Sequence, residues 1–295
     1  GEDIRFIDAD GTMPLPHEIE QWDETGTSYV WVQVPGIGAF STTDHIWMYF
    51  GNGAADDGQD PRAVWDAHYT GVWHLHDDLL DSTGNGHHGT NGGSSDADGL
   101  IGDCQLFDGG DGVSFGPVPG SAASLTFSLW MRTSTDEVYQ RPIEKLPRAG
   151  TEGWSILMRR AGDPSPYDRG MIFRIGSSDT YGGWGREVSA EHVYGRDVWA
   201  LVVGTYDGGT QTGTLYIDGH EVATRTNLDG RGVANTVEDL VIGNTGEDFH
   251  GLIDELRVSD VARTPSFVAA QYLSMTDAFI TYVPLTGPLP FCPSR

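Results

Sequence analysis

Acidic side chains lie within glycine-rich segments at two places in the sequence. Asp81 opens the segment DSTGNGHHG, which also holds Asn85, and Asp108 and Asp111 lie in the segment FDGGDG. Calcium binds roughly six to eight oxygen atoms from carboxylates, backbone carbonyls and water, and loops of this composition supply such oxygens. Both segments are therefore candidates for a structural calcium site. The alternative is that Asp81 and Asp108 form turns, in which the carboxylate accepts hydrogen bonds from its own backbone.

Aromatic and arginine side chains in two further segments could bind a sugar. The segment TYGGWGR places Tyr181, Trp184 and Arg186 among glycines, where packing cannot easily hide them, and Tyr139 and Arg141 lie in another predicted loop. Exposed aromatic rings bind the CH groups of sugars, and planar donors bind hydroxyl groups. These five residues are the candidate ligand-binding residues, and incidental packing within the loops is the alternative.

Composition and charge restrict the class of protein. Of 295 residues, 41 are glycine, which argues against an all-α fold, and 11% are aromatic, which is too many for a disordered chain. The chain has 43 acidic and 17 basic residues and a formal net charge of −26. Such a surface repels phosphate backbones and anionic lipid headgroups, so nucleic acid and membrane partners are disfavoured. No apolar run is long enough for a membrane span, and no signal peptide is visible.

Short alternating apolar runs bounded by turn residues predict an antiparallel β protein. Asp218-Gly219 predicts a hairpin turn, and Asp-Pro and Thr-Pro pairs predict helix starts before 61–68 and 265–273. Trp130, Trp154 and Trp199 fall inside strand patterns and are predicted to be core. The predicted strands cover 28–34, 45–50, 125–132, 154–159, 171–175, 198–205, 214–217, 240–242 and 251–258.

A change of composition near residue 70 predicts two domains and a tail. We expect a small N-terminal β domain over 1–70, a larger β domain over 71–275 and a C-terminal tail over 276–295. The polar stretch 81–99 is expected to be a long ordered loop within the second domain. The two cysteines, Cys104 and Cys292, fit no metal or redox spacing, so we expect one disulfide that holds the tail, with two free buried thiols as the alternative.

Several motifs in the larger domain resemble a known family. Three segments resemble the opening of bacterial laminin G-like domains, which are concanavalin A-like and pentraxin-type. They are GVWHL from Gly71, DSTGNGHHGT from Asp81 and CQLFDGGD from Cys104. The resemblance continues to residue 273 through five further segments: LTFSLWMRTS, DVWALVVGTYDGG, GTLYIDGHEVA, VIGN and FHGLIDELRVSDVARTPSFVAAQY. It implies an all-β, concanavalin A-like jelly-roll β-sandwich whose first and last strands lie side by side.

The N-terminal segment resembles a different family. Residues 1–66 are similar to an uncharacterised β domain that often precedes laminin G-like modules in bacterial surface proteins. The segments that carry the similarity are DIRFIDADGT, LPHEIEQWD, YVWVQVP and MYFGN. One or two strands usual in that family are missing ahead of these motifs, so we expect the domain to be incomplete. Since the chain opens at Gly1 without methionine, it is expected to be a piece of a longer polypeptide.

The resemblance also suggests where a metal would bind. If the terminal strands of the sandwich pair, the loop from Asp81 lies near Asp254 in the GLIDE strand, and relatives commonly hold a structural calcium in that region. We therefore expect Asp81 and Asp254 as carboxylate ligands assisted by Asn85, with Asp108 and Asp111 as the second choice. Zinc is disfavoured because the histidines occur only as pairs, whereas zinc needs three or four converging ligands.

Catalytic signatures are absent from the sequence. Glycosidases need two carboxylates about 5–9 Å apart, and hydrolases of this fold usually carry them as Glu-x-Asp-x-Glu on one strand. The nearest run, EIEQWDE from Glu18, lies in the first domain and is explained by a solvated strand face. Neither a Gly-x-Ser-x-Gly elbow nor a phosphate-binding loop is present. We therefore expect no enzymatic activity.

The function predicted from these features is recognition outside the cell. We expect a secreted or surface-displayed, non-catalytic module that binds carbohydrate and carries a structural calcium, within a larger polypeptide. Its expected partner is a glycan or a protein ligand at the cell surface, with self-association possible through an unpaired strand edge. The alternatives are a structural or assembly unit of a surface or filamentous protein, and a polysaccharide-active enzyme.

Overall fold

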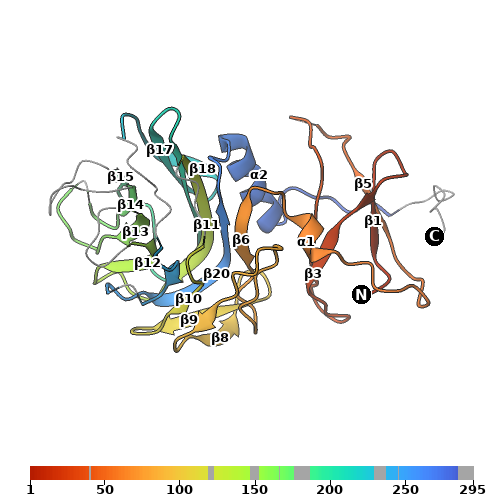
Figure 1. Cartoon of the computed structure of the whole chain (residues 1–295), viewed down its shortest axis with the longest axis horizontal. Helices are drawn as coiled ribbons and strands as arrows, with labels where there is room; N and C mark the ends of the chain where they lie inside the picture. The colour runs from red at the N-terminus through yellow and green to blue at the C-terminus, as the bar shows by residue number, and fades with distance from the viewer. Residues whose placement is uncertain are drawn as a thin grey trace. The chain divides into compact units, whose positions relative to one another are not determined.

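The computed structural model describes residues 1–39, 41–118, 123–146, 153–165, 167–175, 187–228, 237–244 and 246–284. The chain divides into two compact units. One contains Gly1–Asp66 and the described residues from Ile280 on, and the other contains Ala67–Phe279 (Figure 1).

The N-terminal unit is a small β structure with its own core. A three-stranded sheet has the order β2-β1-β5, and β3 pairs with β4 in a separate two-stranded sheet. The core consists of Ile4, Phe6 and Leu15, which are buried among half-buried aliphatic side chains of neighbouring strands. The elements are β1 (Arg5–Asp8), β2 (Pro14–Leu15), β3 (His17–Gln21), β4 (Tyr29–Val32), β5 (Ile46–Tyr49) and the one-turn helix α1 (Pro61–Val64).

The larger unit is a sandwich of two antiparallel sheets. The first sheet has eight strands in the order β18-β17-β16-β11-β20-β9-β8, with β6 also paired to β20, and the second has seven strands in the order β15-β14-β13-β12-β19-β10-β7. The strands of the first sheet are β6 (Tyr69–Trp73), β8 (Ser95–Asp98), β9 (Asp103–Asp108), β11 (Ser124–Thr133), β16 (Ala200–Asp207), β17 (Thr212–Ile217), β18 (His220–Arg225) and β20 (His250–Ser259). The strands of the second are β7 (Thr90–Asn91), β10 (Val113–Ser114), β12 (Gln140–Lys145), β13 (Trp154–Met158), β14 (Met171–Ile175), β15 (Glu187–Ala190) and β19 (Val241–Ile242).

The core between the two sheets follows from the alternation of residues in β11. Leu125, Phe127, Leu129 and Met131 share one face of the strand and are buried in the main core. Across the sandwich, the Phe127 ring stacks on Trp154, with centroids 4.9 Å apart, and meets the edge of Phe173 at 5.3 Å. These aromatic contacts join the two layers, so the predicted β-sandwich is confirmed.

The opposite face of β11 carries the helix α2 (Pro265–Met275). Trp130 lies 5.8 Å from the Tyr272 ring, and its indole Nε1 donates a hydrogen bond to the sulfur of Met275. Gln271 donates to Ser128 Oγ at 2.8 Å. The helix therefore covers one side of the first sheet, as Figure 1 shows, while the other side faces the core.

The ends of the larger unit come together at β20. Its second half pairs with β6, with Leu256 opposite Trp73 and Arg257 opposite Val72, as the resemblance implied. The register against β11 shifts between Ser128 and Trp130, so the strand bulges there, and Glu255 takes a φ of 53°. This bulge places two neighbouring carboxyl side chains, Asp254 and Glu255, inside the unit, where both are fully buried.

Most of the predicted elements agree with the structure, with three corrections. The stretch 81–99, expected to be a long loop, contains the short strands β7 and β8. The helix expected over 61–68 covers only Pro61–Val64, because the backbone becomes extended at Trp65. Trp199 is half-buried rather than core, since it precedes the start of β16. The Asp218-Gly219 hairpin turn is confirmed, with φ values of 51° and 78°.

Lys145, the single lysine of the sequence, lies at the end of β12. It is buried, with 3% of its surface exposed, and its Nζ donates a hydrogen bond to the backbone carbonyl of Glu238 at 2.6 Å. Burial lowers the pKa of Lys145, because it removes water from the ammonium group.

Candidate ligand-binding site

One end of the sandwich carries a cluster of charged and aromatic side chains. Two loops form it, one between β11 and β12 and one between β13 and β14. The backbone N–H of Ala161 donates to the carbonyl of Asp136 at 2.6 Å and so ties the loops together. We call this set the end-loop cluster, and its members are Asp136, Tyr139, Arg159, Arg160, Asp163, Tyr167 and Arg169.

A buried carboxylate lies at the centre of the end-loop cluster. Only 3% of the Asp163 side chain is exposed, and its oxygens lie 2.9 Å from Arg159 Nε and 3.1 Å from Arg160 Nε. The hydroxyl of Tyr139 donates to the same carboxylate at 3.1 Å. Burial acts to raise the pKa of Asp163, but the hydrogen bonds from Arg160 and Tyr139 and the two arginine charges outweigh it, so the pKa lies below its ordinary value.

The Arg159 side chain lies against two aromatic rings. Its Cζ atom is 4.8 Å from the ring centroids of both Tyr139 and Tyr167, and Arg160 Cζ is 5.3 Å from the Tyr139 ring. Such contacts contribute about 0.5–1 kcal/mol each at exposed sites. The hydroxyl of Tyr194 also donates to the backbone carbonyl of Arg159 at 2.5 Å. The loop is therefore held by side chains as well as by its backbone.

Two arginines of the cluster reach solvent. Arg160 and Arg169 have 53% and 43% of their side chains exposed. Each is held through Nε, Arg160 by Asp163 and Arg169 by Asp136 at 2.8 Å. The hydrogen bonds to these carboxylates raise the pKa of both guanidinium groups, so both remain charged. Tyr139 also contributes a hydrogen bond to Arg160, whereas Arg169 has no side-chain hydrogen-bond partner besides Asp136 within the described residues.

The ligand-binding residues predicted from sequence fall in different places. Tyr139 belongs to the end-loop cluster, whereas Arg141 is half-buried and forms ion pairs with Glu144, at 2.7 Å, and with Glu247. Tyr181, Trp184 and Arg186 lie outside the described residues and stay predictions.

Sequence reasoning missed the arginines and Asp163 of the cluster. A signal was present, since Arg159, Arg160 and Asp163 stand three and four residues apart, a spacing at which a turn can bring charges together. The pairing of Arg169 with Asp136, by contrast, joins two different loops and leaves no local pattern.

The structure holds Asp81 as the centre of a turn. Its carboxylate accepts hydrogen bonds from the N–H groups of Val72, Thr83 and His87 and from the hydroxyl of Thr83. Asn85 uses its amide to donate to the carbonyls of Tyr69 and Thr70. These bonds join the 81–89 loop to β6, so the structure agrees with the alternative in which Asp81 forms a turn. They leave few lone pairs of Asp81 for a cation.

Asp254 is bound elsewhere, in the first sheet. Its Oδ2 accepts from the N–H groups of Leu100 and Ile101, at 2.8 and 3.0 Å, and its buried Oδ1 has no partner among the described residues. No hydrogen bond or ion pair joins it to Asp81 in the described part of the chain. Burial and the charge of Glu255 raise the pKa of Asp254 well above its ordinary value.

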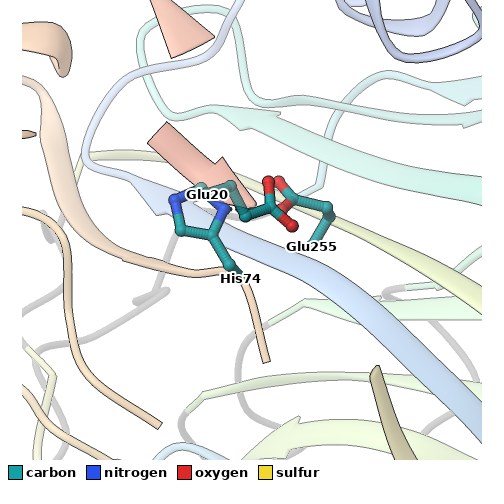
Figure 2. Close-up of side chains that lie close together, drawn as sticks. All are labelled: Glu20, His74 and Glu255. Carbon is teal, nitrogen blue, oxygen red and sulfur yellow. Dashed lines mark hydrogen bonds and ion pairs between the residues drawn. The ribbon is translucent and has the colours of Figure 1, made fainter. Parts of the chain in front are cut away.

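Glu255, the neighbour of Asp254, forms a buried ion-pair network. Its two carboxylate oxygens lie 2.5 Å from His74 Nδ1 and 2.5 Å from Arg257 Nη2. Figure 2 shows the His74 ring, from the residue that follows β6, and the Glu255 carboxyl group, from β20. Burial acts to raise the pKa of Glu255, but the charges of His74 and Arg257 outweigh it and lower that pKa.

Asp108 and Asp111 do lie together, in the loop between β9 and β10. The N–H of Asp108 donates to Asp111 Oδ2 at 3.0 Å. Contact with the Asp111 carboxylate raises the pKa of Asp108, while the hydrogen bond from the Asp108 backbone lowers the pKa of Asp111. Two carboxylates this close repel each other, and a cation between them would relieve that repulsion. Of the predicted metal ligands, Asp108 and Asp111 are the two carboxylates that the structure shows in contact with each other.

Cys104 is buried in β9, and its thiol donates a hydrogen bond to the carbonyl of Asp98. Burial and nearby acidic groups raise its pKa to about 12. Cys292 lies outside the described residues, so the disulfide stays a prediction.

Two family models match parts of this chain. Residues 107–269, more than half of the sequence, match the concanavalin A-like lectin/glucanases superfamily. Residues 1–85 match a domain of unknown function, DUF2341. No curated protein matches the chain. In the described part of the chain, no helix has the length and apolar character needed to cross a membrane.

Solved structures share the fold of the larger unit. Domain 4 of AbnA, a GH43 extracellular arabinanase from Geobacillus stearothermophilus solved in complex with arabinotriose, matches with a TM-score of 0.54 and 24% identity, over 70% of this chain and 98% of that domain. The binding domain of Paraclostridial Mosquitocidal Protein 1 matches with a TM-score of 0.54 and 16% identity, and that of botulinum neurotoxin serotype G with 0.55 and 13%. Each toxin match covers 70% of this chain, which spans about half of the toxin domains, 52% and 51% of their lengths.

Proposed function

This chain belongs to the concanavalin A-like lectin/glucanase superfamily, and we propose that it is a non-catalytic recognition module that binds a glycan outside the cell. The observation that carries the proposal is the match to domain 4 of the arabinanase, which extends over 98% of that domain. That domain was solved with arabinotriose, and the toxin neighbours are binding domains. A sandwich with recognition loops at its ends is a fold on which such binding recurs.

The end-loop cluster gives this proposal a location. Recognition residues are best placed on loops held by a rigid scaffold, because binding then costs little conformational entropy. Here the loops between β11 and β12 and between β13 and β14 are fixed by Asp163 and its three partners. Tyr181, Trp184 and Arg186 remain candidate ligand-binding residues from the sequence.

A glycan-binding assay tests the proposal. We expect the purified chain to bind at least one oligosaccharide on an array that includes arabinotriose, and Trp184→Ala to weaken that binding about tenfold. The matched control is Trp22→Ala, because Trp22 is an exposed tryptophan of the N-terminal unit, with 41% of its surface accessible. Absence of binding to every glycan on the array would contradict the proposal. Incubation with the same polysaccharides should release no product, and any turnover would favour the enzyme alternative.

We also propose a structural calcium at Asp108 and Asp111. Removal of calcium by a chelator should lower the thermal midpoint, because a ligand that binds only the folded state stabilises it. Asp111→Asn should abolish the difference between calcium and chelator, whereas Asp77→Asn, at an exposed carboxylate, should leave it intact. An unchanged midpoint with the chelator would exclude a calcium that supports the fold.

A further inference from the structure

Arg160 and Arg169 lie opposite each other at the base of the loop between β13 and β14. The backbone N–H of Arg169 donates to the carbonyl of Arg160 at 3.3 Å, two residues beyond the last pair of the two strands, Met158 and Met171. Both side chains extend into solvent from this common base. The loop therefore carries two exposed positive charges on adjacent chain segments.

Each of these guanidinium groups is oriented by a carboxylate behind it. Asp163 holds Arg160 through Nε, and Asp136 holds Arg169 through Nε. A guanidinium group has five N–H donors in one plane, and a bond through Nε leaves the Nη atoms for a ligand. Their spacing matches the two oxygens of a carboxylate, which they bind in a bidentate manner.

The backbone beneath the arginines is held in an uncommon conformation. Arg169 has a φ of 44°, although Gly170 directly follows it and would adopt that value without strain. A non-glycine residue at positive φ reduces the stability of the folded state by about 1 kcal/mol or more, and such strained residues occur often at functional sites. The arginine is thus placed where a glycine would be the easier choice.

Arginine side chains lie against the aromatic rings of the cluster. Arg159 lies 4.8 Å from both the Tyr139 and Tyr167 rings, and Arg160 also contacts Tyr139. Arg160 and Arg169 supply charged groups of the cluster that reach solvent. In a chain with 17 basic and 43 acidic residues, three arginines lie between residues 159 and 169, together with Asp163 and Asp168 of the same stretch.

We propose that Arg160 and Arg169 form a subsite for the carboxylate group of an acidic sugar. The inference rests on the proposed glycan-binding function and specifies its ligand class. Two sources supply this chemistry, a uronic acid and a sialic acid, because both carry a planar carboxylate on a sugar ring.

Calorimetric titration with matched probes tests the subsite. The probes are trigalacturonate and its methyl ester, and sialyllactose and lactose, so each pair differs in the presence of a free carboxylate. Titration in about 150 mM salt limits long-range repulsion by the acidic chain, since the Debye length is then about 8 Å. We expect one acidic probe to bind at least about tenfold more tightly than its neutral partner, and the acid that binds identifies the source.

The variants are Arg160→Gln and Arg169→Gln, with Arg196→Gln as the matched control. Each of the first two should weaken binding of the acidic probe about tenfold, as loss of a charged hydrogen bond predicts, and leave the neutral probe unaffected. Arg196 is also an exposed arginine beside a carboxylate, with 56% of its side chain accessible, and lies outside the cluster. Its variant should stay within twofold of the wild type.

The lysine variants, Arg160→Lys and Arg169→Lys, keep the charge and remove the planar fork. They should fold as the wild type does, by thermal melting, and bind the acid with an affinity between those of the wild type and the glutamine variants. Equal binding of acid and neutral probes, or glutamine variants that bind as the wild type does, would overturn the subsite and leave glycan binding intact. Failure of all four probes and of every glycan on the array would overturn both proposals.

Discussion

Asp254 and Asp163 show how differently two buried aspartates behave in one protein. Asp163 has three partners that favour its charged form, and its pKa is lowered. Asp254 accepts two backbone hydrogen bonds on one oxygen, has none on the other among the described residues, and lies beside Glu255, so its pKa is raised. The first carboxylate stabilises its loop, while the second costs free energy whenever it ionises.

The titration of Asp254 predicts how stability depends on pH. The folded state holds a proton on Asp254 at pH values where the unfolded chain, with a pKa near 3.8, has released it. The free energy of unfolding should therefore fall as pH rises from about 4 through the raised pKa of the folded state.

Asp254→Asn removes this titration. The amide oxygen can still accept from Leu100 and Ile101, so we expect the variant to be about 1–3 kcal/mol more stable than the wild type above that raised pKa. Urea unfolding from pH 4 to 9 measures the difference. If Asp254 instead binds calcium, the variant will be less stable in calcium and insensitive to a chelator.

At the scale of elements, β11 is the strand on which both sides of the first sheet depend. Phe127 and its alternate neighbours face the core, and Trp130 and Ser128 face α2. The N-terminus of the helix is capped by Thr264, which accepts from Phe267 N–H at 3.2 Å, and Trp130 and Ser128 contact the helix further along. Its docking is therefore sensitive to one large side chain.

Trp130→Ala should undock the C-terminal half of α2. The substitution removes the contacts with Tyr272 and Met275 and should cost about 3–5 kcal/mol of unfolding free energy. Amide hydrogen exchange should rise in α2 before it rises in β16. Trp22→Ala, at an exposed position, should cost well under half as much, and equal losses for the two variants would contradict this role of Trp130.

The elements were predictable from sequence to the extent that their signals are local. Alternation in β11, the Asp218-Gly219 turn and the Thr264-Pro265 start of α2 each depend on neighbouring residues, and each is confirmed. The β6–β20 pairing joins residues far apart and was expected from the family resemblance alone. In the end-loop cluster, the spacing of Arg159, Arg160 and Asp163 is a local signal, whereas the pairing of Arg169 with Asp136 of another loop has none. Likewise, the composition of the 81–89 loop could not separate a metal ligand from a turn former at Asp81.

At the scale of the whole molecule, the net charge of −26 opposes the compact state. Unfolding separates like charges, so added salt, which screens them, should favour the folded chain. We expect the thermal midpoint to rise by several degrees between about 10 and 300 mM sodium chloride. Sodium and tetramethylammonium chloride should act alike, since screening depends on ionic strength. A midpoint that falls with either salt would show that attractive ion pairs dominate.

The buried position of Lys145 has a practical consequence for studying recognition. Amine-reactive reagents modify accessible amino groups, and the one lysine is almost fully enclosed, with its ammonium group bonded to a backbone carbonyl. Coupling to an activated sensor surface should therefore proceed through the α-amino group. All molecules coupled through an amine would then be attached at the same group of the N-terminal unit, with the arginine-bearing loops chemically unaltered.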